Sequence, residues 1–285
     1  MLLCDLFETL YRPLRLRGRS ANTTRLYGCT LRSFSKWLGY EATLQDLTDL
    51  TISRFLEHRA SIRSPYTAEK ERSQLLSLWR LAADRNLLKD RPCVPPGPLP
   101  ERTPEAWSLE QMQALMRSAE ATRGTVGNVE ARYWYPALIS VLWETAERIG
   151  AVLACTPHDF VQPTLAVRAE YRKGGKRDRI CRLSEETCER VRLACGTHRI
   201  FEWTQNPGYL WRRYKDVVAR AGLGTSRKCG FHQLRRTAAS HYAALGGDPV
   251  KLLDHSSPRI TQRWYLDRRM TDREPPACDV LPKIG

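Results

Sequence analysis

Long hydrophobic runs are absent from this sequence of 285 residues. No stretch reaches the roughly 18 to 20 apolar residues that a transmembrane helix needs. The first twenty residues contain Asp5 and Glu8, where a secretory signal peptide has a basic segment followed by an apolar one. These absences argue against a membrane or secreted protein, and we expect a cytoplasmic location.

Two further absences concern metals and nucleotides. The nine cysteines are scattered without any CxxC pair, whereas a structural zinc site needs two close pairs of ligands. The sequence also lacks the GxxxxGK[ST] loop that cradles nucleotide phosphates. We therefore expect reduced thiols, no metal site and no cofactor.

Positive charge is what the sequence has in excess. It contains 46 lysines and arginines against 31 aspartates and glutamates, a formal net charge of +15. The excess is spread along the chain, with 16 basic and 10 acidic residues in 1–95 and 30 and 21 in 96–285. An excess of this size favours a polyanionic partner, usually nucleic acid, although basic surfaces that only aid solubility remain an alternative.

The chain divides at a proline-rich segment. Residues 91–104 hold six prolines and one glycine, a composition typical of an extended, semi-rigid linker. Before it, three segments within residues 21–90 carry apolar residues at helical spacing. We expect a helical bundle over residues 1–91, a linker over 92–104 and a second domain over 105–285.

The second domain has a mixed pattern. Ser108 with Gln111 predicts a capping box at the start of a helix, and residues 133–155 read as one long apolar helix. Two short strands are expected around Gly174-Gly175 as a β-hairpin, and the rest is expected to be helical up to a loose C-terminus. The predicted fold class is mainly α with a small β-hairpin or sheet, an α+β domain behind a helical bundle.

Several residues in this domain could carry chemistry. Arg148 lies in the predicted apolar helix, where it either pairs with Glu144 or Glu147 or points its guanidinium at a phosphate. His232 and Arg235 are three residues apart and are expected to share one helix face. The predicted hairpin is basic, which means either solvated charges or a finger that reaches nucleic acid; its residues include Arg172, Lys173, Lys176 and Arg177.

The last candidate segment is LLDHSSPRITQRWYLDRR, which starts at Leu252. Ser257 and Pro258 predict the N-cap and first position of a helix running to about residue 268. Tyr265 lies on this helix, ten residues after His255, and Trp264 is expected to face the core. Taken alone, Tyr265 could be a packing residue, a base-stacking residue or a nucleophile.

The order of these segments resembles the tyrosine recombinases, the phage-integrase family. TAERIGAVLA resembles the first arginine box, and KGGKRDRICRL resembles the β-hairpin lysine motif. HQLRRTAASHYAALGG is similar to the HxLRxTxAT segment, and LLDHSSPRITQRWYLD is similar to the LGHSSxxxTxxxY ending. The resemblance covers about residues 105–270, while residues 1–91 match the family's SAM-like core-binding domain in layout only.

The resemblance implies a role for each matching position. Tyr265 would attack a DNA phosphodiester to give a 3′-phosphotyrosine and a free 5′-hydroxyl, without metal or ATP. Arg148 and Arg235 would hold the non-bridging oxygens, and His255 would donate to the same phosphate. His232 would help move the tyrosine proton, and Lys173 would protonate the leaving oxygen. DNA contacts are expected from four further residues: Arg172, Lys176, Arg177 and Arg236.

The implied partners are double-stranded DNA at a specific site and three further copies of the chain, as a homo-tetramer at the nucleoid. A type IB topoisomerase and a catalytically inactive integrase-like DNA-binding protein remain alternatives. Two positions depart from the family pattern: Asp254 stands where glycine is usual, and Ala151 stands where an acid is usual. The Asp254 carboxylate could repel a phosphate, and aspartate tolerates a left-handed turn less well than glycine.

Overall fold

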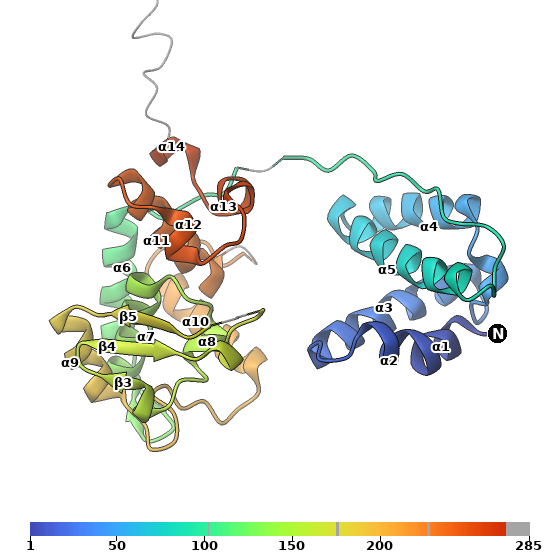
Figure 1. The fold of residues 1–285 in the computed structure, drawn as a ribbon. Coiled ribbons are helices and arrows are strands. Elements are labelled where there is room, and N and C mark those ends of the chain that lie inside the picture. The colour runs from blue at the N-terminus through green and yellow to red at the C-terminus, as the bar shows by residue number, and fades with distance from the viewer. Residues whose placement is uncertain (102, 175–176, 227–228, 272–285) are drawn as a thin grey trace, which may run out of the picture. The chain divides into compact units, whose positions relative to one another are not determined.

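The computed structural model describes residues 1–101, 103–174, 177–226 and 229–271. The chain forms two compact units, Met1–Glu101 and Arg102–Gly285 (Figure 1). Their boundary falls within the proline-rich segment, whose residues 91–101 form neither helix nor strand. The expected loose segment at the C-terminus lies outside the described residues.

The first unit is a helical bundle, as the apolar spacing predicts. Side-chain oxygens of Ser20, Thr48 and Ser64 accept hydrogen bonds from first-turn backbone N–H groups and so start its three long helices. Gly39 ends the first of these in the left-handed conformation. Its elements are α1 (Leu3–Leu6), a π-helix (Phe7–Tyr11), α2 (Arg12–Arg15), α3 (Ala21–Leu38), a 3₁₀ turn (Leu44–Asp46), α4 (Asp49–Ile62) and α5 (Pro65–Asp84).

A buried ion pair crosses this bundle between α4 and α5. The Arg59 guanidinium donates two hydrogen bonds to the Glu71 carboxylate, at 2.7 and 2.9 Å. The two side chains are only 13% and 3% exposed. Removing one partner from such a pair leaves the other charge buried and uncompensated.

The second unit is built around one central helix. Helix α7, which is apolar on almost every side, packs against α6, α9 and α11. The helices are α6 (Leu109–Glu120), α7 (Ala131–Thr145), α8 (Ile149–Val152), α9 (Glu185–Ala194), α10 (Pro207–Arg220), α11 (Phe231–Ala244), α12 (Pro249–Leu253), α13 (Pro258–Trp264) and α14 (Arg268–Thr271). The mainly α fold with a small sheet is therefore confirmed.

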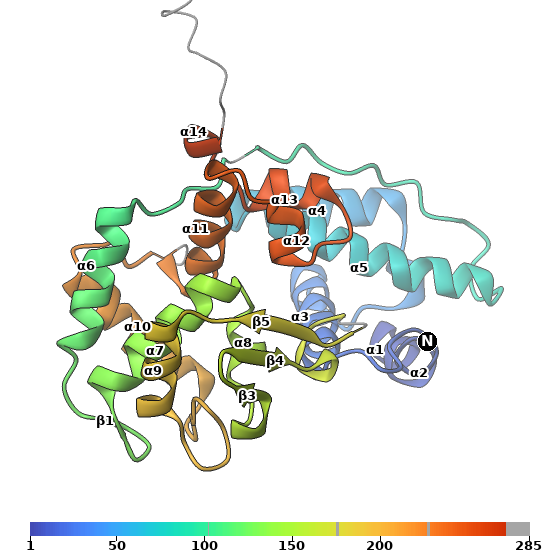
Figure 2. The same ribbon diagram turned by 60° about the vertical axis from the view of Figure 1, so that its left-hand side comes forward.

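A three-stranded antiparallel sheet lies beside α8 in both views (Figures 1 and 2). Its order is β3 (Phe160–Val161), β4 (Thr164–Val167) and β5 (Arg179–Arg182), and a separate hairpin pairs β1 (Thr125–Val126) with β2 (Val129–Glu130). Strands β4 and β5 confirm the expected hairpin. Their connection, however, spans residues 168–178 and includes a 3₁₀ turn, Ala169–Tyr171, so the strands do not meet at a tight turn.

The prediction of one long apolar helix over residues 133–155 is wrong, because the chain forms two helices there, α7 and α8, with a break between them. Helix α7 ends at Thr145, and Ala146 adopts a left-handed conformation with φ +49°. Arg148 is then the N-cap residue of the short helix α8 and not an interior helical residue. The break takes Glu147 and Arg148 out of the path of α7.

The helix in the second half of the last motif is shorter than expected. Helix α13 begins at Pro258, as predicted, but ends at Trp264 instead of about residue 268. Tyr265 follows it and is 8% exposed, whereas Trp264 is 42% exposed. The expectation that Trp264 faces the core is therefore wrong, because Tyr265 takes the buried position.

No helix of the described residues is long and apolar enough to cross a membrane. None of the eight cysteines in the same part of the chain forms a disulfide, and three of them are buried, namely Cys155, Cys181 and Cys188. Cys278 lies outside the described residues.

The buried pair in the first unit gives a stability prediction. Glu71→Ala should lower the free energy of unfolding of this unit by about 3 to 5 kcal/mol, because Arg59 stays largely buried without its partner. Glu8→Ala is the matched control: it removes an exposed pair with Arg12, whose side chains are 56% and 54% exposed, and should cost about 0 to 1 kcal/mol. Amide hydrogen exchange of α4 and α5 at increasing urea measures both; equal losses in the two variants would contradict the prediction.

Candidate active site

Tyr265 lies where three distant segments of the second unit meet. It packs in a small cluster with Ala146, Ala238 and Leu253, which come from the end of α7, from α11 and from the end of α12. Two histidine rings contact the tyrosine ring edge to face, with centroids 5.1 Å away for His232 and 4.6 Å away for His255. The expected histidines and tyrosine are therefore brought together.

Arg235 is buried against the Tyr265 ring. Its side chain is 1% exposed, and its Cζ lies 5.5 Å from the centre of the Tyr265 ring. The guanidinium donates to the backbone oxygens of Ala146 and Leu253, the latter at 2.7 Å. His232 and Arg235 both face Tyr265, so the predicted shared helix face is confirmed. Burial and then the nearby charge of Arg148 lower the pKa of Arg235 to about 10.

A buried carboxylate, Glu147, lies directly under this arginine. One of its oxygens accepts hydrogen bonds from Arg172 Nε and Arg179 Nη1, both at 3.0 Å. Its other oxygen lies 3.9 Å from Arg235 Nη1 and accepts the backbone N–H of Arg148 at 3.2 Å. The Glu147 side chain is fully buried, so this one negative charge is shared among three arginines.

Arg148 is half-buried at the N-cap of α8, and its side chain behaves differently from the other arginines. Within the described part of the chain, no hydrogen bond or ion pair involves its guanidinium. Of its two expected partners, Glu144 instead accepts hydrogen bonds from Ser184 and Thr187, and Glu147 pairs with the other arginines. Arg148 lies close enough to His232, Arg235 and His255 to lower the pKa of each. It is therefore a free cation near the three side chains that surround Tyr265.

Both histidines are neutral at physiological pH. Desolvation by the surrounding side chains, followed by the charges of nearby arginines, lowers the pKa of His232 and that of His255 to about 4 each, although His232 keeps part of its surface exposed to solvent. His255 Nε2 lies 3.4 Å from Arg235 Nη2, which can only donate, so Nε2 is the acceptor. His255 Nδ1 then carries the proton and donates to Thr261 Oγ1 at 2.9 Å. Thr261 stands in the quoted motif, but sequence reasoning gave it no role.

The basic residues of the hairpin separate into two groups. Lys173, Gly174 and Arg177 are exposed on the β4–β5 connection, and Lys176 lies outside the described residues. Arg172 is buried instead of facing solvent as expected, with its side chain 3% exposed and held by Glu147 and Asp254. Lys173 is exposed, and its link to the site is that it directly follows the buried Arg172.

Arg236 is partly buried beside the cluster, and burial lowers its pKa. Its Nε has no hydrogen-bond partner among the described residues. It follows Arg235 on α11, so its side chain leaves the helix on a neighbouring face.

Asp254 takes the backbone conformation of a glycine and pairs with Arg172. It adopts the left-handed conformation, with φ +50°, that a glycine would provide. Its carboxylate accepts from Arg172 Nη1 at 2.9 Å and lies 3.7 Å from Arg177 Nη2. The hydrogen bond with Arg172 is the main cause that lowers the pKa of Asp254. The carboxylate thus points at the hairpin arginines.

The backbone around Tyr265 is held by residues that sequence reasoning missed. Ser240 Oγ donates to the Tyr265 carbonyl at 3.2 Å and accepts the Asp267 N–H at 2.9 Å. Asp267, which is 1% exposed, accepts the N–H of Ala106 at 2.8 Å. The only sequence signal was an acidic residue two positions after the tyrosine.

Trp107, the residue after Ala106, is bound to α11. Thr237 Oγ1 accepts the Trp107 N–H at 3.1 Å, and His241 Nε2 lies 2.9 Å from the Trp107 carbonyl oxygen. His241 also packs against the Trp143 ring, which agrees with its expected structural role.

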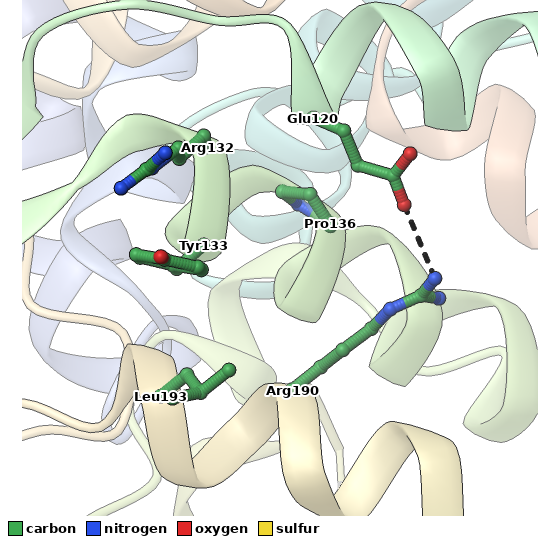
Figure 3. A pocket seen from close by; sticks show the side chains of 6 residues that line it. All are labelled: Glu120, Arg132, Tyr133, Pro136, Arg190 and Leu193. Carbon is green, nitrogen blue, oxygen red and sulfur yellow. Dashed lines mark hydrogen bonds and ion pairs between the residues drawn. The ribbon is translucent and has the colours of Figure 1, made fainter.

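The described residues contain no group of three or more histidine, cysteine, aspartate or glutamate side chains that could hold a metal ion. A cavity of about 280 Å³ lies elsewhere, between α6, α7 and α9 (Figure 3). Arg190 pairs across it with Glu120, and Arg132 stacks on Tyr133. Both arginines of this cavity are thus already engaged, and none of the six expected catalytic residues lines it.

Comparison with known proteins gives results only at the level of structure. No protein-family model matches the chain, and no curated protein sequence matches it. A lambda integrase(75–356) dimer bound to a COC′ core site superposes with a TM-score of 0.74 at 19% identity, covering 100% of this chain and 99% of that chain. A lambda integrase tetramer bound to a Holliday junction gives a TM-score of 0.69 at 19% identity, covering 90% and 78%.

A third neighbour is the XerH site-specific recombinase bound to a palindromic difH substrate in a post-cleavage complex. Its TM-score is 0.69 at 16% identity, with 93% of this chain and 80% of that chain covered. These neighbours are tyrosine recombinases, and the fold expected from the sequence motifs is confirmed. The chain has the tyrosine-recombinase fold.

Proposed function

We propose that this protein is a site-specific DNA recombinase in which Tyr265 cleaves and rejoins DNA through a 3′-phosphotyrosine. The observation that carries the proposal is the convergence on Tyr265 of Arg235, His232 and His255 beside the unpaired Arg148. These residues come from separate segments of the chain, and packing alone gives no reason to bury Arg235 against a phenol beside two histidines and a second arginine.

The charge distribution suits a phosphodiester. Phosphoryl transfer depends mainly on stabilising the charge of the equatorial oxygens and on holding the attacking and leaving oxygens in line. Arg148 has its guanidinium available, and Arg235 is already fixed by backbone oxygens. The two guanidiniums can bind the two non-bridging oxygens, and in this proposal they do the work that a metal ion does in other enzymes.

The proposed reaction conserves atoms and bonds. The Tyr265 oxygen forms a bond to phosphorus, and the bond from phosphorus to the 5′-oxygen breaks. The phenol proton passes to a base, for which the neutral ring of His232 is placed next to Tyr265. The leaving oxygen takes a proton from Lys173 on the hairpin connection. Rejoining reverses these steps, so neither ATP nor a metal is needed.

The proposed partner is double-stranded DNA at a specific site. Arg177, Lys176 and Arg236 are the proposed DNA contacts outside the reacting centre, whereas the burial of Arg172 fits an internal role better. One protomer carries one Tyr265, and exchange between two duplexes needs four strand cuts. A homo-tetramer is therefore proposed, and one structural neighbour is a tetramer on a Holliday junction.

The covalent step gives the first functional prediction. A pool of duplexes with randomised central sequence and a nick near its middle should yield a protein–DNA adduct that survives denaturation, because the nicked strand loses its short 5′-hydroxyl fragment. Tyr265→Phe should abolish the adduct, since the phenylalanine ring packs in the same place without a nucleophile. Trp264→Phe, at the exposed neighbouring position, is the control and should keep it. An adduct formed by Tyr265→Phe would refute the assignment.

The same pool separates the alternatives. A wild-type protein that binds DNA but forms no adduct from any sequence would indicate an inactive integrase-like protein. Relaxation of a supercoiled plasmid without a second site would instead indicate a type IB topoisomerase.

The histidine pKa values give a prediction for DNA binding. In the free protein both pKa values are about 4, and a bound phosphodiester adds a negative charge that raises them. Proton uptake on binding then makes the dissociation constant fall as pH is lowered from 7.5 to 5.5. The double variant His232→Gln with His255→Gln should show a smaller pH dependence, measured by fluorescence anisotropy at constant ionic strength. An unchanged dependence in the double variant would contradict the prediction.

A further inference from the structure

We propose that Asp254 is a positioning residue that latches the β4–β5 connection, and Lys173 with it, to the turn that carries His255. The proposal deepens the proposed function, because it rests on Lys173 acting at the leaving oxygen. Asp254 stands where the family pattern has glycine, and the proposal assigns a function to its carboxylate.

The latch consists of one buried arginine held by two carboxylates. Arg172 Nε donates to Glu147 at 3.0 Å, and Arg172 Nη1 donates to Asp254 at 2.9 Å. Only a guanidinium has donors spaced to hold two carboxylates in this way, since a lysine is a single point charge. The Arg172 side chain is 3% exposed, whereas that of Asp254 is 35% exposed, so Asp254 closes the latch from the solvent side.

The two ends of the latch belong to different parts of the site. Arg172 directly precedes Lys173 on the β4–β5 connection. Asp254 directly precedes His255, and Leu253 on its other side accepts a hydrogen bond from Arg235. Fixing Arg172 to Asp254 therefore fixes the lysine segment relative to the turn that holds both His255 and the Arg235 partner.

The backbone at Asp254 permits a clean test. Its φ of +50° lies in the left-handed region that glycine adopts without strain. Asp254→Gly therefore removes the carboxylate and keeps the turn, and Asp254→Asn removes the charge and also tolerates this conformation. Glu170→Gln is the matched control, because Glu170 is an exposed acid on the same connection and belongs to neither the latch nor the catalytic cluster.

The first measurement needs no activity. Amide hydrogen exchange of peptides covering residues 164–182 in the free, full-length protein should be faster in Asp254→Gly than in wild type, by about tenfold or more in the connection. Exchange in α7 and α11 should stay unchanged, and Glu170→Gln should match wild type. If exchange in the connection does not change in Asp254→Gly, the latch does not exist and the proposal is overturned.

The second measurement uses two nicked substrates of one selected sequence, with oxygen or sulfur at the bridging 5′ position. A thiolate leaves without help from an acid, because a thiol is far more acidic than an alcohol; the thiol of cysteine, for example, has a pKa of about 8.5. Asp254→Gly should slow adduct formation on the oxygen substrate by about tenfold to a hundredfold and barely affect the sulfur substrate, as expected when a positioned acid is lost.

The outcomes separate the two proposals. Equal slowing on both substrates would place Asp254 at the phosphate instead of the leaving oxygen and overturn the positioning role, as would faster cleavage by Asp254→Gly. A wild-type protein that forms no adduct on either substrate refutes the proposed function, while hydrogen exchange still decides whether Asp254 holds the connection.

Discussion

The buried carboxylate of Glu147 is the interaction on which the rest of the second unit's site depends. It binds Arg172 from the β4–β5 connection and Arg179 from β5, and it lies under Arg235 from α11. A sheet, a helix and the break after α7 thus meet at one negative charge. Without it, three arginines would remain with little compensation in the interior, which costs several kcal/mol per ion.

One negative charge does not neutralise three arginines, and Arg148 adds a fourth nearby. The surroundings of Tyr265 therefore keep a net positive charge, which adds to burial in lowering the pKa values of both histidines. Such a site is prepared for an anion before the anion arrives, so little reorganisation is needed on binding. Ala151 leaves empty the acidic position that the family pattern would fill, and Glu147 supplies a carboxylate four residues earlier.

The sequence predicted what depends on local pattern. Helices α3 to α5, the Ser108 capping box and the β4–β5 hairpin follow from periodicity and turn chemistry, and the motifs named the residues that meet at Tyr265. The break at Ala146 was missed because the apolar pattern continues through it. The burial of Arg172 was missed because its partners lie 25 and 82 positions away along the chain. Arg235 is held by backbone oxygens, which leave no side-chain signature in a sequence.

The attachment of residues 105–107 has a mechanical consequence. Gln233 donates to the Glu105 carbonyl, Asp267 accepts the Ala106 N–H, and Thr237 accepts the Trp107 N–H. These hydrogen bonds are the first contacts that the chain makes with α11 and the tyrosine segment after the proline-rich linker. Proline-rich linkers are extended and semi-rigid. A force applied along this linker is therefore transmitted to these hydrogen bonds, because the linker has little length left to extend. The load therefore reaches Gln233, next to His232 on α11, and Asp267, two residues beyond Tyr265, through the first residues after the linker.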